Sequence, residues 1–472
     1  MHQFFKTKTK IVGTLGPSST DVGTIKKMLE AGLTVARINM SHGDHEEHAI
    51  KIKNARAAAK AAKRPLAILQ DLSGPKIRIG DFSTEDVTLV PGKKLTLTTN
   101  KCVGTVEEVS VNYPKLPKEV TVGMHIYLND GKQKLLIDKV TDTDIHTTII
   151  VGGTIKGRRG VNIPDADLSI SSLTAKDKVD LKFGIEQKVD FMTLSFVRTA
   201  DDIHLLRKLI GKENNIAIVA KIETKHAIEN LEAIVEAADV IMVARGDLAI
   251  ETPLEKVPLL QKKIIKTANY AGKPVITATQ MLDSMRISTT PTRAEVADIA
   301  NAILDGTDAL MLSDESAIGA HPDLAIDVMS KVAKEIETDQ YFTEKAPWDF
   351  PTLTVADAVT HSIAHSVQPI KAKVIAALSE SGKTARMIAR HRPNAPILVL
   401  TPHQSTYNKM LIAFGCEPFI IKRVNDLTAA RKVARDIIAK NGIAQKDDSF
   451  ILGAGIPFGS SGATNTMLIE RL

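Results

Sequence analysis

Three ionisable residues that follow two consecutive apolar runs could hold a divalent cation beside an anionic group. Lys221 and Glu223 stand two residues apart in VAKIE, so on a strand they face the same side. Asp247 follows the next apolar run in VARGDLAIE. Two carboxylates supply the oxygen ligands that suit Mg²⁺ or Mn²⁺ and leave room for substrate oxygens, as a phosphoryl-transfer ion requires. A plain ion pair between Lys221 and Glu223 is the alternative.

A second polar group could bind phosphate. Arg37, Asn39 and Ser41 alternate in ARINMSHG and would present a guanidinium, an amide and a hydroxyl to the same space. Arginine suits phosphate because its planar fork donates two hydrogen bonds, although a lone Arg37 would more often be a structural ion-pair residue. His42, beside Gly43, could contact a nucleotide or cap a turn.

The segment LQDLSGPKIR combines a carboxylate, a hinge and two cations. Asp71 ends an apolar run, and the Gly74-Pro75 pair marks a hinge-like exit. Lys76 and Arg78 share one parity and could offer positive charge to a phosphate. A solvated basic linker is the alternative.

Two glycine and threonine motifs add candidates. Thr277, Thr279 and Gln280 lie in VITATQML, where threonine serves either β-propensity or substrate hydrogen bonding and proton delivery. Gly246, in the Arg-Gly-Asp turn, permits a short helix whose amides point at an anion, or is an ordinary turn glycine.

Eight short apolar runs, alternating with helical segments, would position these residues. Such runs suit parallel strands covered on both faces. They are Lys10 to Gly16, Thr34 to Met40, Leu66 to Leu72, Asp190 to Val197, Ile216 to Glu223, Val240 to Asp247, Pro274 to Gln280 and Ala309 to Ser313. Helices are expected over Asp21 to Ala31, Thr174 to Gln187, Lys256 to Ala271 and Pro291 to Leu304.

The eight units predict a (β/α)₈ barrel. Periodicity alone also allows an open doubly wound sheet. The barrel is favoured because polar residues, including Arg245, Ser313 and Glu315, gather where strands end, which is the rim that carries barrel active sites.

Two further regions complete the expected organisation. Alternating residues and turn signals over 73–159 predict an inserted small all-β lid domain, a β-barrel by expectation, that divides the (β/α)₈ barrel domain into 1–72 and 160–345. A C-terminal open α/β sheet domain is expected over 346–472, with strands at Val374 to Ser379, Ile397 to Thr401, Cys416 to Ile421 and Phe450 to Gly455. TEKAPWDFPTL, with the sole tryptophan, is interpreted as the linker before it.

Composition excludes several classes. A hydrophobic fraction of 43% and a charged fraction of 25% are ordinary for a globular protein and exclude a disordered chain. No apolar run reaches the roughly 18 residues of a membrane span, and MHQFFKTKTK lacks the apolar stretch of a signal peptide. Cys102 and Cys416 have no metal-ligand spacing, which indicates reduced thiols and a cytoplasmic location.

With these residues assembled, the chain resembles the pyruvate kinase family. The motifs KIVGTLGPSS, LQDLSGPKIR, ITATQMLDSM and ANAILDGTDA occur in the family's order, and the resemblance runs from Lys10 to Ile469. It implies transfer of a phosphoryl group from phosphoenolpyruvate to ADP, a homotetramer, and no nucleic-acid or membrane partner.

The resemblance also implies roles for individual residues. Glu223 and Asp247 would bind Mg²⁺ or Mn²⁺, while Lys221 and Arg37 would hold the phosphoryl group. Thr279 would help to place a proton, and backbone amides around Gly246 and Asp247 would hold the substrate carboxylate. The ADP side would be lined by Asn39, His42, Arg78 and Arg159, with Asp130 on the lid.

One departure from the family concerns K⁺. Many members bind K⁺ near the equivalents of Asn39, Ser41, Asp71 and Leu72 and carry glutamate at the position of Lys76. Lys76, with Leu72 and Ile79, resembles the K⁺-independent branch, so a fixed ammonium is expected to replace K⁺. Ala249 and Asp314 also replace usual glycines near the rim.

The C-terminal region carries an expected effector loop. It opens a helix after a strand, which suits phosphate, and consists of Ser379, Glu380, Ser381, Gly382, Lys383 and Thr384. Because Glu380 is acidic, activation by AMP or a sugar monophosphate is expected; an unoccupied structural turn is the alternative.

Three other functions compete. A Mg²⁺-dependent aldolase or lyase would share the carboxylates but would not need the lid or the basic ADP side. A nucleic-acid-binding protein is suggested only by the net charge of +6 and leaves the rim cluster unexplained. A catalytically silent sensor is the third, although every expected catalytic residue type is present.

Overall fold

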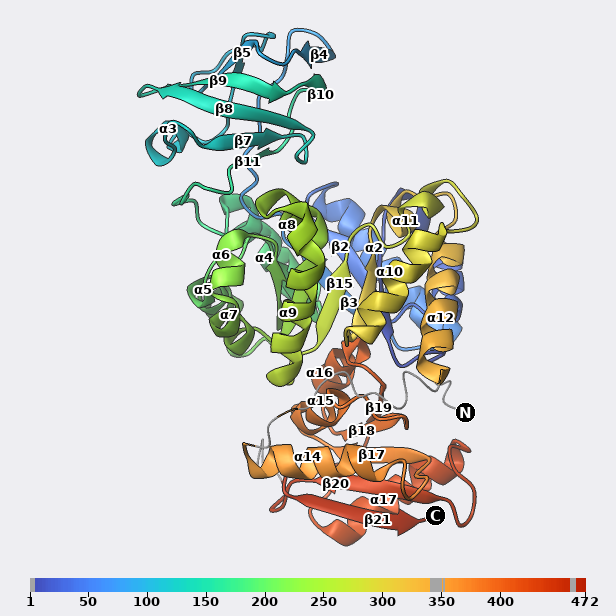
Figure 1. Cartoon of the computed structure of the whole chain (residues 1–472). Helices are drawn as coiled ribbons and strands as arrows, with labels where there is room; N and C mark the ends of the chain where they lie inside the picture. Colours follow the sequence, from blue (N-terminus) through green and yellow to red (C-terminus); the bar gives the residue numbers. More distant parts are fainter. Residues whose placement is uncertain (1–4, 340–349, 351–352, 459–463) are drawn as a thin grey trace.

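The computed structural model describes residues 5–339, 350, 353–458 and 464–472. Three regions follow one another along its long axis, with the barrel in the middle, the insertion at one end and the C-terminal region at the other (Figure 1). The expected linker, including Trp348 and the boundary at 345/346, lies outside the described residues except for Phe350 and Leu353.

Eight parallel strands close into the predicted barrel, in the order β1-β16-β15-β14-β13-β12-β3-β2. Every residue of six of them is buried, and β2 and β13 each have one half-buried residue, as continuous apolar runs require. The strands are β1 (Lys10–Thr14), β2 (Val35–Asn39), β3 (Ala67–Asp71), β12 (Phe191–Leu194), β13 (Ala217–Ile222), β14 (Val240–Ala244), β15 (Val275–Ala278) and β16 (Ala309–Leu312).

Helices surround the barrel and begin at side-chain caps. Asp21 caps α1, and Thr174 forms a capping box with Asp177 at the start of α4. The helices are α1 (Val22–Ala31), α2 (His45–Ala62), α4 (Ala175–Glu186), α5 (Ala200–Ile210), α6 (Lys225–Glu229), α7 (Leu231–Ala237), α8 (Arg245–Glu251), α9 (Val257–Tyr270), α10 (Arg293–Leu304), α11 (Asp314–Ala317) and α12 (Pro322–Thr338). Short 3₁₀ turns occur at η1 (Pro17–Ser19), η2 (Leu254–Lys256) and η3 (Asp283–Arg286).

Several predicted boundaries were wrong; β12, for example, ends at Leu194 and not at Val197. Helix α10 begins at Arg293, because Thr292 and Glu295 form the capping box, so Pro291 lies outside the helix. Strand β14 stops at Ala244, since the Arg-Gly-Asp segment already belongs to α8. Strand β15 stops at Ala278, since the next two residues have left-handed backbones.

The insertion is built from two small sheets around one apolar core. The sheet orders are β10-β4 and β11-β7-β8-β9-β5-β6, so the strands do not pair into one closed barrel, and the short helix α3 makes the segment not purely β. Its elements are β4 (Asp86–Leu89), β5 (Lys94–Thr98), β6 (Glu108–Ser110), α3 (Leu116–Glu119), β7 (His125–Leu128), β8 (Gln133–Val140), β9 (Asp144–Val151), β10 (Gly153–Lys156) and β11 (Val161–Asn162).

The C-terminal region is the predicted open α/β sheet, in the order β19-β18-β17-β20-β21. The antiparallel strand β21 was missed, because its polar and charged residues do not form an apolar run. The elements are α14 (Val355–Ser366), β17 (Val374–Leu378), α15 (Lys383–Ala389), β18 (Ile397–Thr401), α16 (Gln404–Lys409), η4 (Met410–Ile412), β19 (Cys416–Ile420), α17 (Leu427–Lys440), β20 (Ser449–Ala454) and β21 (Thr466–Arg471).

The C-terminal region closes the floor of the barrel, opposite the rim. Leu411 and Ile412 of η4 pack into the same buried cluster as strand residues of the barrel interior. The Asp308 carboxylate, at the start of β16, lies 3.0 Å from the Arg392 guanidinium and accepts a hydrogen bond from the backbone N–H of Phe414. These contacts leave the C-terminal ends of the strands free to carry a site.

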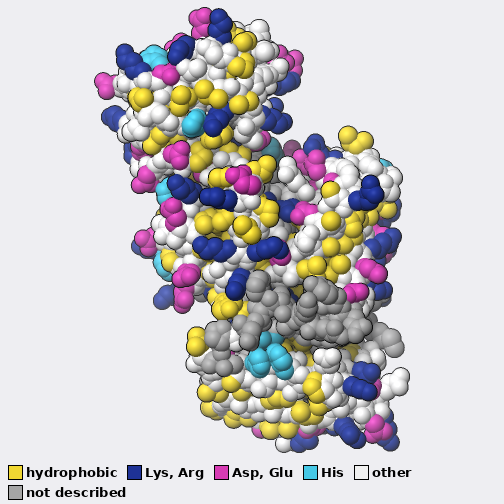
Figure 2. All heavy atoms as spheres, in the orientation of Figure 1, with side chains coloured by type: hydrophobic (Ala, Val, Ile, Leu, Met, Phe, Trp, Pro, Cys, Tyr) yellow, Lys and Arg dark blue, Asp and Glu magenta, His cyan; other side chains and the backbone are white. Residues whose placement is uncertain are grey.

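The surface charges concern the nucleic-acid-binding alternative, and the helices concern the membrane-spanning class. On the face in Figure 2, Lys and Arg side chains are interspersed with acidic and apolar ones instead of forming one basic patch. None of the helices in the described ranges has the length and apolar character to cross a bilayer.

Candidate active site

Lys221 and Glu223 form a buried ion pair at the C-terminal end of β13. Lys221 Nζ lies 3.0 Å from Glu223 Oε2, as the two-residue spacing predicts, and the Glu223 side chain is fully buried. Lys221 Nζ also donates to Ser195 Oγ at 2.9 Å. The lysine therefore stands at the rim with two of its directions already occupied.

The charges around Lys221 keep it protonated. Burial lowers the pKa of Lys221, but the carboxylate of Glu223 raises it, and those of Asp71 and Asp247 raise it further, so that the net pKa lies above its usual value. The Arg37 guanidinium opposes this only in part. A cation at this place is what a migrating anionic group needs.

Arg37 and Asp71 form a second ion pair on the neighbouring strands β2 and β3. Arg37 Nε donates to Asp71 Oδ2 at 2.8 Å, and Nη2 lies 2.6 Å from the same oxygen. Nη1 donates to Thr14 Oγ1 at 2.8 Å. Asp71 and Thr14 thus set the plane of the guanidinium.

Gly246, Asp247 and Thr279 lie together on the wall of a cleft of about 1410 Å³ between the rim and the insertion. The Gly246 N–H donates to Thr279 Oγ1 at 2.9 Å. A substrate carboxylate that uses this amide must therefore displace the threonine hydroxyl.

Thr279 is held in a strained backbone conformation. Its φ is 73°, and that of Gln280 is 53°, in a region that β-branched and long side chains rarely adopt. Arg245 Nη2 donates to the Thr279 carbonyl at 2.6 Å, and Arg245 Nη1 donates to Asp298 at 2.7 Å. Arg245 therefore fixes the end of β15 instead of facing a ligand.

Some polar residues near the strand ends are structural. Glu315 is buried and accepts from the backbone N–H groups of Leu282 and Ser313. Thr277 is buried and donates to Thr307, so it does not reach the rim surface. Asp314, more than half exposed, lies 3.9 Å from Arg286, and Ala249 lines the cleft.

The residues expected on the nucleotide side are split between two places. Asn39 Oδ1 accepts from the Ser41 N–H, so they form one turn after β2, where Ser41 and His42 are exposed. Arg78 and Arg159 lie on adjoining segments at the base of the insertion, since Arg78 pairs with Gly160. Among the described residues, no hydrogen bond or ion pair joins the turn after β2 to the base of the insertion.

Lys76 points toward the insertion. Its Nζ lies 3.8 Å from Asp130 Oδ1, and about a third of the side chain is exposed. Among the described residues, Lys76 makes no hydrogen bond or ion pair with Asn39, Ser41, Asp71 or Leu72, which sequence reasoning grouped with it.

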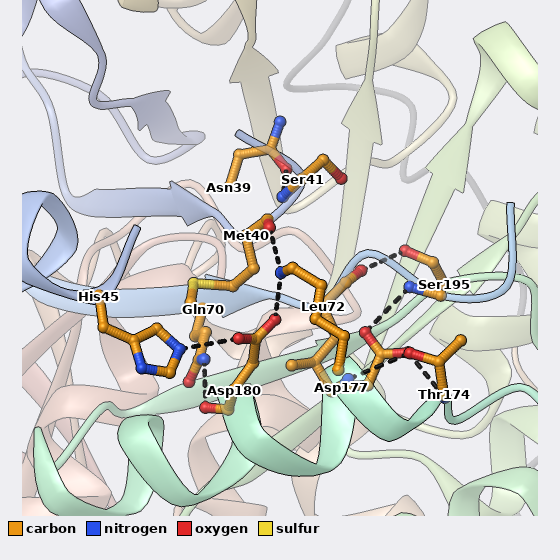
Figure 3. Close-up of polar contacts among 12 residues, drawn as sticks. Asn39, Met40, Ser41, His45, Gln70, Leu72, Thr174, Asp177, Asp180 and Ser195 are labelled. Atoms are coloured by element: carbon orange, nitrogen blue, oxygen red, sulfur yellow. Dashed lines mark hydrogen bonds and ion pairs between the residues drawn. The ribbon is translucent and has the colours of Figure 1, made fainter. Parts of the chain in front are cut away.

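A different lysine contacts that turn. Lys176 Nζ donates to the Met40 carbonyl at 2.7 Å and to Asp180 at 2.6 Å. Figure 3 shows Asp180 also meeting His45 and Gln70 below the Asn39–Ser41 turn. Helix periodicity indicated α4 but could not show which rim residue its lysine contacts.

Sequence reasoning also missed the end of β12. Ser195 accepts from Lys221, and the Phe196 N–H donates to Glu223 Oε1 at 2.7 Å. The only available signal was a serine after an apolar strand, at the same relative place as the other rim residues.

The two rim carboxylates fit a divalent cation. Burial raises the pKa of Glu223, the Lys221 cation opposes this, and the nearby Asp247 charge raises the pKa further. Within the described residues no cluster of three or more His, Cys, Asp or Glu is arranged to hold a metal. A Mg²⁺ ion here would take two protein carboxylates and complete its shell with water and substrate oxygens.

Glu380 of the expected effector loop is paired with side chains from outside the loop. Glu380 Oε2 accepts from Arg423 at 3.0 Å and lies 2.5 Å from His403 Nε2. The Glu380 carbonyl accepts from Thr406, and Gly382 caps α15 with a φ of 80°.

A closed parallel barrel with a cationic lysine, an arginine and two carboxylates at its rim has the groups that a phosphotransferase needs. Family models for the pyruvate kinase barrel domain and the pyruvate kinase alpha/beta domain match residues 6–326 and 357–470. A pyruvate kinase of Thermotoga maritima is 43% identical over 98% of this chain and 99% of its own, and one of Geobacillus stearothermophilus is 42% identical over 98% and 80%. A crystal structure of a pyruvate kinase from Cryptosporidium parvum superposes with a TM-score of 0.91 at 34% identity, over 99% of this chain and 96% of that one.

The chain belongs to the pyruvate kinase family and is a phosphotransferase. This confirms the family and fold predicted from the motifs, and it excludes the aldolase or lyase alternative. Neither the roles of individual residues nor the K⁺ requirement follows from this membership, and both stay predictions.

Glu251 of α8 gives a pH-dependent prediction. Its carboxylate accepts from Asn162 of the insertion at 3.0 Å. Burial raises the pKa of Glu251 to about 7, with Asp247 and Asp165 adding to this and Asn162 opposing it. Because this folded-state pKa exceeds the ordinary value of 4.5, protonated Glu251 stabilises the folded protein relative to the unfolded chain. This stabilisation is fully present below pH 4.5 and is lost as the pH rises through about 7.

We therefore expect Glu251→Gln, which cannot ionise but keeps an acceptor for Asn162, to gain melting temperature relative to wild type as the pH rises from about 4.5 to about 7, and to keep that advantage at higher pH. The exposed Glu186→Gln is the matched control. Differential scanning calorimetry of the metal-free protein measures both; an offset of Glu251→Gln that does not change with pH would contradict the prediction.

Proposed function

We propose that this chain transfers the phosphoryl group of phosphoenolpyruvate to ADP, giving pyruvate and ATP as a step of glycolysis in the cytoplasm. The observation that supports this best is the buried Lys221 ammonium with Glu223, Asp71 and Asp247 around it, in a chain of the pyruvate kinase family. Phosphoryl transfer depends on positioning and charge more than on covalent chemistry.

Lys221 and Arg37 act on the migrating phosphoryl group. Lys221 has one N–H direction beyond those taken by Ser195 and Glu223, and it neutralises the phosphoryl group and then the enolate left behind. Arg37 clamps the same phosphate, with its plane set by Asp71 and Thr14.

Glu223 and Asp247 hold Mg²⁺ or Mn²⁺, which when bound supplies a Lewis acid for the substrate oxygens. The backbone amides of Gly246 and Asp247 hold the substrate carboxylate. Thr279, whose hydroxyl this carboxylate displaces from the Gly246 N–H, helps to place the proton that converts enolate to pyruvate.

The insertion, predicted over residues 73–159 and extending through β11 to Asn162, acts as the lid. The cleft is lined from both sides, by Asp130 and Lys132 of the insertion and by Asp247 and Thr279 of the barrel. Its volume of about 1410 Å³ leaves room for a substrate beside Asp247 and Thr279. Lid closure brings Arg78 and Arg159 toward Asn39 and His42 around ADP and excludes water, which would otherwise take the phosphoryl group.

K⁺ is not required in this proposal. Lys76 carries a permanent ammonium at the hinge, four positions after Leu72 in the chain, and this charge would supply what K⁺ brings in other members of the family. In the described structure its ion-pair partner is Asp130, 3.8 Å away, so the ammonium must leave Asp130 to reach the turn that holds Asn39 and Ser41.

We expect full activity in a coupled assay with phosphoenolpyruvate, ADP and Mg²⁺ in K⁺-free buffer. Chelation of Mg²⁺ should abolish it, since two carboxylates would then repel across the site. Lys76→Glu should become dependent on KCl, because the substitution removes the built-in cation.

The matched control is Lys53→Glu, which changes an exposed helix lysine by the same charge and should not create a KCl requirement. No ATP formation under any condition would overturn the proposed function. Wild-type activity that collapses without K⁺ and returns with KCl would overturn only K⁺ independence.

The enzyme is proposed to be a homotetramer activated by AMP or a sugar monophosphate at the loop 379–384. In the described structure the Glu380 carboxylate already engages the Arg423 guanidinium and the His403 ring, two groups that could donate to a phosphate. Burial raises the pKa of Glu380, but the hydrogen bonds from Arg423 and His403 lower it further, so it stays ionised. An effector phosphate must therefore compete with it.

Glu380→Gln should lower the effector concentration needed for half-activation, because a neutral amide competes less well for Arg423 and His403. Rates at subsaturating phosphoenolpyruvate, titrated with AMP and with a sugar monophosphate, measure this, with Glu186→Gln as control. Rates unchanged by either compound in wild type and variant would eliminate this regulation.

A further inference from the structure

The geometry points to Ser195 as a positioning residue that sets the direction of the Lys221 ammonium; this rests on the proposed function. Ser195 follows β12, a barrel strand whose end, like that of β1, carried no predicted site residue. Its side chain is buried, with 2% of the residue exposed, so its hydroxyl must be satisfied by protein groups.

The hydroxyl of Ser195 has only one useful orientation. Ser195 Oγ donates its proton to the Leu72 carbonyl at 2.8 Å, a contact drawn in Figure 3. Its lone pairs are then left to accept from Lys221 Nζ at 2.9 Å. Leu72 is itself fixed, because its N–H donates to the Thr193 carbonyl of β12.

Within the described ranges, the hydrogen bond to Ser195 and the ion pair to Glu223 leave one N–H of the Lys221 ammonium free to bind a ligand. An ammonium has three N–H donors. One goes to Ser195, and a second faces Glu223 Oε2 at 3.0 Å. In the part of the chain that the structure describes, Lys221 Nζ makes no other hydrogen bond, so the third donor is the one available to a phosphoryl oxygen.

Phe196, the residue after Ser195, orients the Glu223 carboxylate. Phe196 has a φ of 54°, a strained value for a bulky residue. This conformation directs its N–H to Glu223 Oε1 at 2.7 Å. Glu223 therefore keeps a second restraint when Ser195 is altered, and the effect of Ser195 is confined to Lys221.

The test compares Ser195→Ala with Ser330→Ala. Ser330 is also buried and also donates to a backbone carbonyl, that of Ala31 at 2.6 Å, but lies on α12, away from the rim. We expect kcat of Ser195→Ala to fall about tenfold, the effect of one lost hydrogen bond. KM for phosphoenolpyruvate and ADP should stay nearly unchanged, and Ser330→Ala should keep the wild-type kcat. Circular dichroism and melting curves verify that both variants are folded.

A second readout does not depend on turnover. In protein with ¹⁵N-labelled lysine, the Lys221 ammonium signal is assigned by its loss in Lys221→Met. It should exchange faster with water in Ser195→Ala than in wild type and Ser330→Ala. An unchanged kcat, an equal loss in Ser330→Ala, or an unchanged signal would each overturn the role of Ser195. An inactive wild type would instead overturn the proposed function and the role with it.

Discussion

The site depends on the electrostatic attraction between one buried lysine, Lys221, and the three carboxylates that surround it. Glu223, Asp71 and Asp247 all act on Lys221, and only Arg37 adds a second cation. Removing such a charge from water costs on the order of several kcal/mol per ion unless the charge is paired and hydrogen-bonded. The barrel meets this condition by closing, since β13, β14, β3 and β2 bring the four partners to one rim. The remaining acidic excess is what a divalent cation would neutralise.

Local strain accompanies this cluster. Phe196 and Thr279 both have left-handed backbones, and each places a group that the site uses: the N–H on Glu223 and the hydroxyl on Gly246. Such conformations cost about 1–3 kcal/mol and persist only where surrounding contacts over-determine them. Arg245 supplies that contact for Thr279 through the carbonyl. At these two positions of the rim, the strained backbone therefore positions a group of the site.

Much of the fold could be predicted because parallel barrel strands are buried on both faces and so form continuous apolar runs. The eight strands and the open C-terminal sheet were found this way, whereas β21, with Glu470 and Arg471, has no such run. The ends of β14 and β15 were placed too late, because Asp247 already lies in α8, which begins at Arg245, and Thr279 adopts a positive φ. Hydrophobicity encodes neither feature. Parity on a strand placed Lys221 beside Glu223 correctly. It could not reveal that Ser195 supports Lys221 or that Lys176 contacts Met40, because these contacts join elements far apart in sequence.

The central claim is that Glu223 and Asp247 share one cation beside Lys221. Binding of Mn²⁺, followed by electron paramagnetic resonance in the absence of substrates, tests it most directly. Wild type should show one site that is lost in both Glu223→Gln and Asp247→Asn and kept in Asp314→Asn, which alters an exposed carboxylate of the same cleft. Wild-type Mn²⁺ affinity in either of the first two variants would contradict the account.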